Sequence, residues 1–67
     1  MTVYKIIDIV GVSDVSFAEA AKAAVIEAAK TVRGIRRAEV SKLDIKVEND
    51  KPVSFRAEMR ISFELER

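Results

Sequence analysis

Cysteine, histidine and tryptophan are all absent from this chain of 67 residues. Without cysteine there is no disulfide to stabilise the fold, and without cysteine or histidine the usual zinc ligands are missing. The same absences remove the histidine proton shuttle and the Ser-His and Cys-His nucleophile pairs. We therefore predict that the protein is not an enzyme, and the sequence presents no catalytic residue.

Aromatic residues and charge of one sign are also scarce. One Tyr and three Phe are the only aromatic residues, and twelve basic residues are balanced by eleven acidic ones. Nucleic-acid-binding proteins carry a basic patch, often with aromatic side chains for base stacking, so nucleic acid is not an expected partner. The sequence has no apolar run typical of a signal peptide or membrane span, which predicts a cytoplasmic protein that does not bind a membrane.

The chain is short for a stable fold. It makes one domain, residues 1–67, and a domain of this size buries only about 60% of the surface that its unfolded chain exposes. Since disulfides and zinc are excluded, another source of stability is needed. The simplest one is other copies of the same chain.

Residue patterns predict a strand and then a helix in the first half of the chain. Val3–Val10 is rich in β-branched residues and apolar at both parities, which favours a strand buried more fully than the last one. Ser16–Glu19 has the spacing of a capping box. We expect a helix from Phe17 to Arg33 that ends at Gly34, a residue suited to a left-handed C-terminal cap.

The expected helix is amphipathic. Its apolar stripe consists of Phe17, Ala21, Ala24, Val25, Ala28 and Val32, and the opposite side carries Glu19, Lys22, Lys30 and Arg33. The seven alanines of this helix either act as helix formers or let it lie close against a sheet or a second helix. Ile26 lies among the charges and is either an ordinary exposed residue or a contact with a neighbouring subunit.

Two long strands complete the pattern. In Val53–Leu65 apolar and polar residues alternate without a break, as in a strand with one apolar and one polar face. In Ile35–Glu48 the parity changes: Ala38 and Val40 are apolar at even positions, whereas Leu43, Ile45 and Val47 are apolar at odd ones. A β-bulge at Ser41 or Lys42 is needed to keep the apolar set on one face. Asn49–Pro52 is the predicted turn, with the proline at the first position of the last strand.

Together these elements give an α+β fold of strand-helix-strand-strand order, with the helix packed on a long curved antiparallel sheet. The thirteen residues of the last strand reach roughly 43 Å at ~3.3 Å per residue, whereas a helix of about 17 residues reaches roughly 25 Å. The helix cannot cover the apolar face of such a hairpin. We therefore expect a homo-oligomer of closed symmetry, in which bent hairpins build a ring or a hollow shell.

Three stretches follow a known family pattern: Val3–Val32, the AEV of Ala38–Val40 and the ISFELE of Ile61–Glu66. They resemble the dodecin family over nearly the whole chain. The resemblance implies a helix wrapped by its own curved hairpin, and twelve copies in a hollow sphere of cubic 23 symmetry with the helices outside. It also implies storage of riboflavin or flavin mononucleotide (FMN) in pairs at two-fold axes, and in some members binding of coenzyme A, phosphate or metal ions.

Three positions depart from the flavin-binding pattern of that family. The resemblance places Arg37 where a Trp stacks on the flavin ring, Arg56 where a Gln bonds the flavin edge, and Lys46 near an acidic residue of some members. Strand parity independently puts all three on one polar face, and they are the candidate ligand-binding residues. An Arg brings a charge that must be desolvated or paired, so tight flavin binding of the familial kind is not expected.

Several uses of this polar face remain open. Alternating charges on neighbouring strands form cross-strand ion pairs on a solvated face. Alternatively, basic residues that meet at symmetry axes bind an anion such as phosphate, a nucleotide or coenzyme A. The resemblance adds calcium, since a Trp-lacking branch of the family binds it and carboxylates from several chains suit a hard cation. The acidic residues in question are Asp8, Asp14, Glu39, Asp44, Glu58 and Glu64. No dedicated metal-ligand spacing is present, and a structural shell without a ligand is the last alternative.

Overall fold

The computed structural model describes residues 2–65 and contains four elements in the expected order. Strand β1 spans Tyr4–Ser13, helix α1 spans Phe17–Ala29, strand β2 spans Ile35–Glu48 and strand β3 spans Lys51–Glu64. The predicted α+β class and strand-helix-strand-strand order are therefore confirmed. Met1, Glu66 and Arg67 lie outside the described residues, and with them the last residue of the Ile61–Glu66 stretch.

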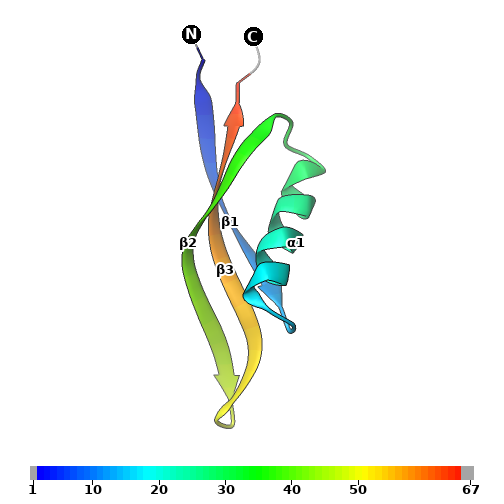
Figure 1. Cartoon of the computed structure of the whole chain (residues 1–67), viewed down its shortest axis with the longest axis vertical. Coiled ribbons are helices and arrows are strands. Elements are labelled where there is room, and N and C mark those ends of the chain that lie inside the picture. Colours follow the sequence, from blue (N-terminus) through cyan, green and yellow to red (C-terminus); the bar gives the residue numbers. More distant parts are fainter. Residues whose placement is uncertain (1, 66–67) are drawn as a thin grey trace.

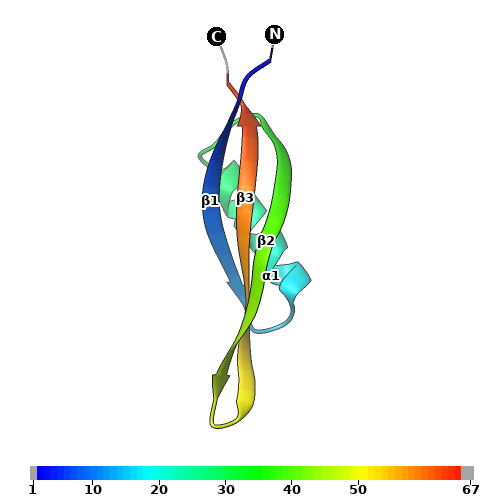
Figure 2. The ribbon, with the colours of Figure 1, turned by 90° about the vertical axis from the view of Figure 1, so that its left-hand side faces the viewer.

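The three strands form one antiparallel sheet in the order β1-β3-β2, with α1 on one face of it (Figure 1). We call this the helix-side face, and the opposite one, turned toward the viewer in Figure 2, the helix-free face. The chain is 51 Å long and only 19 × 13 Å across. The β2–β3 hairpin extends beyond the helix (Figure 1), which confirms that α1 does not cover it.

Strand β1 is more exposed than its sequence suggested. It lies at the edge of the sheet, and Val10 and Val12 on its helix-free side are 52% and 57% exposed. The expectation that β1 is buried more fully than the last strand is wrong for a single chain. Strand β3 is instead the central strand, and its Ala57, Met59 and Ile61 are buried because α1 and both neighbouring strands surround them.

Helix α1 begins where the sequence predicts. Ser16 is the N-cap, and its Oγ accepts a hydrogen bond from the backbone N of Glu19 at 3.0 Å. The carboxylate of Glu19 lies 3.7 Å from Nζ of Lys22. The first half of the capping box is thus formed, while the Glu19 side chain faces a lysine one turn along the helix.

The C-terminal end of α1 comes earlier than predicted. The helix stops at Ala29 rather than just before Gly34. The backbone N atoms of Thr31 and Val32 both donate to the carbonyl oxygen of Ala28, at 3.2 and 2.9 Å, and close the last turn. Gly34, at φ +76°, then accepts a hydrogen bond from the end of β3 and directs the chain into the sheet. Within residues 2–65 there is no helix long and apolar enough to span a lipid bilayer.

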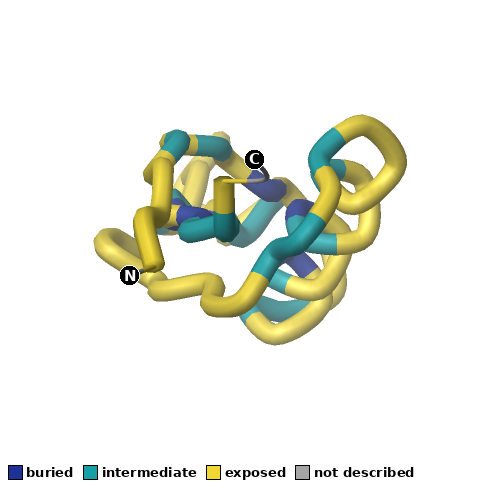
Figure 3. Tube along the Cα trace, turned by 90° about the horizontal axis from the view of Figure 1, so that it is seen from above, coloured by how far each residue is buried: buried dark blue, intermediate teal, exposed yellow. Residues whose placement is uncertain are grey.

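The core is small and lies where α1 crosses the sheet, and Figure 3 shows how few segments of the chain are buried. Among the described residues the buried hydrophobic ones are Ala20, Ala24, Ala57, Met59 and Ile61. Ala20 was missing from the predicted stripe. A Cβ at Gly11 would collide with the carbonyl oxygen of Ala20 and lie 2.9 Å from Cβ of Ala24. The small residues of α1 therefore serve close packing, one of the two interpretations left open by the sequence.

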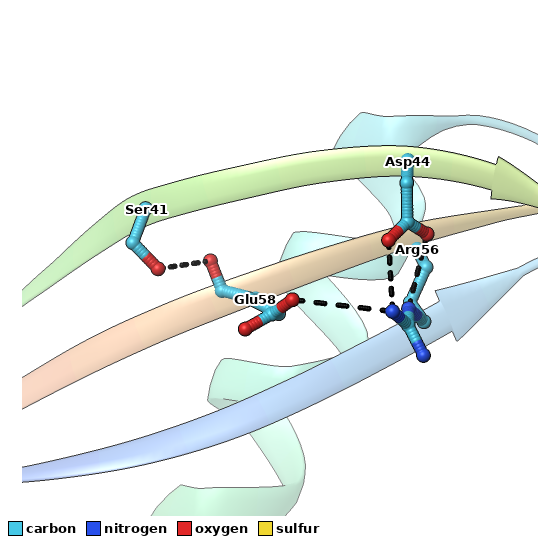
Figure 4. Close-up of polar contacts among 4 residues, drawn as sticks. All are labelled: Ser41, Asp44, Arg56 and Glu58. Carbon is cyan, nitrogen blue, oxygen red and sulfur yellow. Dashed lines mark hydrogen bonds and ion pairs between the residues drawn. The ribbon is translucent and has the colours of Figure 1, made fainter.

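Strand β2 contains the predicted β-bulge. Its pairing with β3 shifts between Val40 and Lys42, so Ser41 is the extra residue. Oγ of Ser41 donates a hydrogen bond to the carbonyl oxygen of Glu58 at 3.1 Å (Figure 4). Two further register shifts lie near the ends of the strand. The bulge keeps apolar residues of both parities on the helix-side face.

The turn between β2 and β3 has two residues, not the four predicted. Asn49 and Asp50 form it with φ of 52° and 61°, and Glu48 pairs directly with Lys51. Left-handed backbone at both central positions is what a tight type I′ hairpin requires. Pro52 is the second residue of β3 rather than the first, and it lies beside a register shift, where pairing is already irregular.

Candidate functional site

The strand register puts the polar residues of β2 and β3 on the helix-free face, as parity predicted. Arg56 lies opposite Asp44 of β2 and Val12 of β1. Four residues farther along β3, Arg60 lies opposite Glu39 and Asp8. The helix-free face is therefore charged along β2 and β3, whereas β1 contributes mainly apolar side chains to it.

Two of the three candidate ligand-binding residues, Lys46 and Arg56, share a hollow of about 470 Å³ on this face. We call it the Arg56 hollow; its lining residues are Val12, Asp44, Lys46, Ser54 and Arg56. Nζ of Lys46 lies 3.5 Å from the carboxylate of Glu48 on the same strand. Both basic side chains therefore reach the hollow with a carboxylate close by.

Arg56 is held by Asp44 through two hydrogen bonds (Figure 4). Nε donates to Oδ1 at 3.0 Å and Nη2 donates to Oδ2 at 2.8 Å, while Oε2 of Glu58 lies 3.9 Å from the same Nη2. The hydrogen bond with Asp44 raises the pKa of Arg56 above its ordinary value. The guanidinium is therefore charged at any working pH, and the pair joins β2 to β3. This confirms cross-strand ion pairing at this position.

The Asp44 pair bears on anion binding. The carboxylate occupies the planar fork that an Arg presents to phosphate oxygens. A phosphate that enters the Arg56 hollow must therefore compete with Asp44, which lies on the neighbouring strand and is already in position. The Asp44 carboxylate thus weakens the hypothesis that this hollow collects an anion.

The third candidate, Arg37, lies in a different hollow, of about 640 Å³. We call it the Arg37 hollow; it is lined by Ile6, Arg37, Ala38, Glu39, Arg60 and Ser62. Arg37 lies opposite Ser62 of β3, which is six residues, roughly 20 Å, from Arg56 along the strand. One chain therefore does not bring Arg37, Lys46 and Arg56 together, and a site that uses all three needs more than one copy.

Some lining residues of the Arg37 hollow were missed by sequence reasoning. Arg60 and Ser62 have the even parity of the polar face of β3, and that signal was sufficient to find them. Ile6 is different, because only the pairing of β1 with β3 brings it to the Arg37 hollow. Tyr4 lines an adjoining hollow of about 360 Å³ together with Arg37.

The acidic residues of one chain do not form a metal centre. Within residues 2–65 no three carboxylates lie close enough together to hold an ion. Several of them face a cation instead: Asp8 lies 3.8 Å from Arg60, Asp44 and Glu58 lie beside Arg56, and Glu64 lies 3.0 Å from Arg36. Calcium takes six to eight oxygen ligands, and within residues 2–65 the carboxylates of one chain are too dispersed to supply several of them at one point.

One protein family matches nearly the whole chain. The model of the Dodecin family matches residues 3–66. The chain belongs to the dodecin family. Calcium dodecin from Mycobacterium tuberculosis is 38% identical to this dodecin over 65 residues, which are 97% of this chain and 92% of that protein. The family predicted from the sequence is therefore confirmed.

Solved structures of dodecins have the same fold. The crystal structure of the M. tuberculosis calcium dodecin, described as having a novel calcium-binding site, has a TM-score of 0.84 and covers 96% of this chain and 91% of that one. A variant of the T. thermophilus dodecin, 27% identical, has a TM-score of 0.93 and covers 100% of both chains. The dodecin from Streptomyces davaonensis, 21% identical, reaches 0.93 over 98% of this chain and 97% of that one. As a dodecin, the protein is a small-molecule-binding protein.

Proposed function

We propose that this dodecin acts as a homo-oligomer, with twelve copies as the expected number, that binds and sequesters calcium. The observation that carries the proposal is its 38% identity, over 97% of the chain, to a calcium dodecin. We further infer that the protein stores its ligand without catalytic turnover. We also infer a location in the cytoplasm, because a chain without cysteine has no disulfide that would need an oxidising compartment.

The donor chemistry of the chain supports calcium over softer metals. With no cysteine or histidine, the available metal ligands are carboxylate, hydroxyl, amide and carbonyl oxygens, which are the donors that calcium prefers. One chain does not fit the ion, because its carboxylates are dispersed and several face cations. The proposed calcium site is therefore shared between copies.

Flavin and coenzyme A have weaker support. Among the described residues, those lining the Arg37 hollow include no aromatic ring. A flavin there would meet Arg37 and Arg60 in place of a flat apolar surface. In the Arg56 hollow, a phosphate of FMN or coenzyme A would have to displace Asp44 from Arg56. The proposed roles of Arg37, Lys46 and Arg56 in holding a ligand stay predictions.

The test is a calorimetric titration of metal-free protein with calcium chloride, with magnesium chloride as the matched control and light scattering on the same sample. We expect saturable calcium binding at less than one ion per chain, because each site is shared, and weaker magnesium binding, because magnesium demands stricter geometry. An intact oligomer that takes up no calcium would contradict the proposal. Saturable quenching of riboflavin or FMN fluorescence by that oligomer would then assign the flavin function instead.

A further inference from the structure

Each cation of the Arg56 hollow faces a carboxylate of the same chain. Arg56 donates two hydrogen bonds to Asp44, at 3.0 and 2.8 Å. Nζ of Lys46 lies 3.5 Å from the carboxylate of Glu48, and Oε2 of Glu58 lies 3.9 Å from Nη2 of Arg56. Two cations thus have three carboxylates beside them, and the group carries one net negative charge. A surface with this balance of charge does not attract anions.

The strand register places Asp44 beside Arg56 without any ligand. The two residues lie directly opposite each other on β2 and β3. The bulge at Ser41 keeps Asp44 on the helix-free face, where Arg56 also lies. The Asp44–Arg56 pair therefore forms with a loss of side-chain freedom only, whereas a free anion also loses translational and rotational freedom when it binds. Asp44 has this entropic advantage over any phosphate in solution.

The geometry of the pair is the one that Arg uses to bind phosphate. Exposed ion pairs contribute little unless they are bidentate, and this pair joins Nε and Nη2 of Arg56 to the two carboxylate oxygens of Asp44. Carboxylates and phosphates bind the same planar fork of a guanidinium. Asp44 therefore occupies the position that a phosphate would need on this edge of Arg56.

The other edge of the Arg56 guanidinium, between Nη1 and Nη2, is also unfavourable for a phosphate. Nη2 belongs to both edges and lies 3.9 Å from Oε2 of Glu58, too far for a hydrogen bond. Asp44 and Glu58 approach the guanidinium from different sides (Figure 4). A phosphate on the second edge would lie close to the Glu58 carboxylate, and like charges repel. Glu58 thus adds repulsion, while Asp44 alone holds the fork.

We propose that Asp44 is a specificity-determining residue that excludes phosphate-bearing molecules from the Arg56 hollow by acting as the internal counter-ion of Arg56. Arg56 is then a latent anion-binding residue that a single carboxylate keeps occupied. Lys46 and Ser54 line the same hollow and supply further donors to an anion once the Asp44 charge is removed. The inference goes beyond the proposed function, because it concerns phosphate and needs no metal ion.

Calorimetric titration of metal-free protein with inorganic pyrophosphate, at constant pH and ionic strength, tests the proposal. Asp44→Asn keeps the shape of the side chain and removes its charge. We expect it to bind pyrophosphate at least about tenfold more tightly than the unmodified protein, since a bidentate charged contact becomes available. Arg56→Gln in addition should abolish the gain. Arg56→Gln alone should change nothing, because Arg56 is already occupied in the unmodified protein.

Glu58→Gln is the matched control. It removes one negative charge beside the same Nη2 of Arg56 and leaves the two hydrogen bonds between Arg56 and Asp44 in place. We expect a gain in pyrophosphate affinity of only about twofold, because an interaction between exposed charges is weak when the fork stays occupied. The comparison separates occupation of the fork from the net charge of the hollow.

Equal gains from Asp44→Asn and Glu58→Gln would show that net charge excludes the anion, and would overturn the role of Asp44. The proposal would also fail if an Asp44→Asn oligomer, intact by light scattering, bound pyrophosphate no better than the unmodified protein. Weaker binding by Arg56→Gln alone would contradict it as well. If Asp44→Asn does not assemble, Asp44→Ser replaces it with the same expectation. Calcium uptake is tested separately, so these outcomes leave the proposed function standing.

Discussion

Gly11 sets the distance between α1 and the sheet, and it has no space for a side chain. We expect Gly11→Ala to lower the free energy of unfolding by about 3 kcal/mol, because a rigid backbone carbonyl, that of Ala20, stands in the way. Urea denaturation at fixed protein concentration measures the loss. The matched control is Gly34→Ala, where the nearest atom to a new Cβ is 3.4 Å away. For Gly34→Ala we expect a loss of about 1 kcal/mol, because the only strain is that of a residue with a Cβ in left-handed backbone. A larger loss for the control would contradict the assignment.

Individual residues of the candidate site could be predicted in part. Parity, with the predicted bulge allowed for, placed Arg37, Lys46 and Arg56 on the face opposite the helix, because side chains alternate on each side of the bulge. The separation of Arg37 from the other two depends on the register between strands, which one sequence does not specify. Nor did the sequence show that Asp44 holds Arg56, since several acidic residues share that face.

At the scale of elements, the start of α1 depends on Ser16. Its hydroxyl satisfies one of the backbone donors that the first turn leaves free. We expect Ser16→Ala to cost about 1 kcal/mol of stability, and urea denaturation with helix content followed by circular dichroism measures it. The control is Thr2→Ala, because Thr2 is exposed and precedes β1. This substitution should change stability by less than about 0.5 kcal/mol. Equal effects of the two substitutions would refute the role of the cap.

Strands and helix ends differ in how far the sequence determines them. The alternation in β3 and the parity break in β2 gave the hairpin and its bulge, because one buried face selects one register. The predicted end of α1 was wrong, since no glycine or proline stands between Ala29 and Gly34 and the apolar stripe continues to Val32. The chain leaves the helix there because Ile35 must reach its partner on β3. That demand comes from the sheet and leaves no local pattern.

At the scale of the whole molecule, we expect stability to depend on concentration. Among the described residues the core holds only five buried side chains, three of them alanines, which leaves one copy marginal, and association stabilises the native state by mass action. The apparent melting temperature should rise with protein concentration, as differential scanning calorimetry measures. Leu43→Asp, at an apolar residue of β2 that is 50% exposed in one copy, should lower that temperature and weaken its dependence on concentration.

Ile26→Asp is the matched control for that experiment. Ile26 is 59% exposed and lies on α1. Its substitution should leave the concentration dependence unchanged. If Ile26→Asp had the larger effect, the outer side of the helix would be the contact surface, which is the interpretation of Ile26 that the sequence left open.

The overall shape was the most predictable property, because it follows from lengths. A short helix cannot cover a strand that reaches roughly 43 Å. The folded chain is indeed long and narrow, with a length of 51 Å. The arrangement of several such chains is another matter. It depends on which side chains of the edge strands are exposed. The apolar residues at both parities of β1 did not by themselves show that those on its helix-free side are exposed in one chain.

The extra residue in β2 also constrains how the chain can change length during evolution. Loss of Ser41 itself would only remove the bulge, because Leu43 would stay opposite Ala57 and Asp44 opposite Arg56, each on its present face. Loss of one residue between Lys42 and the turn, with the bulge kept, would instead exchange the polar and apolar faces of the residues beyond it. Insertions and deletions between the bulge and the turn are therefore tolerated only in steps of two, whereas the turn at Asn49 and Asp50 is free of this restriction.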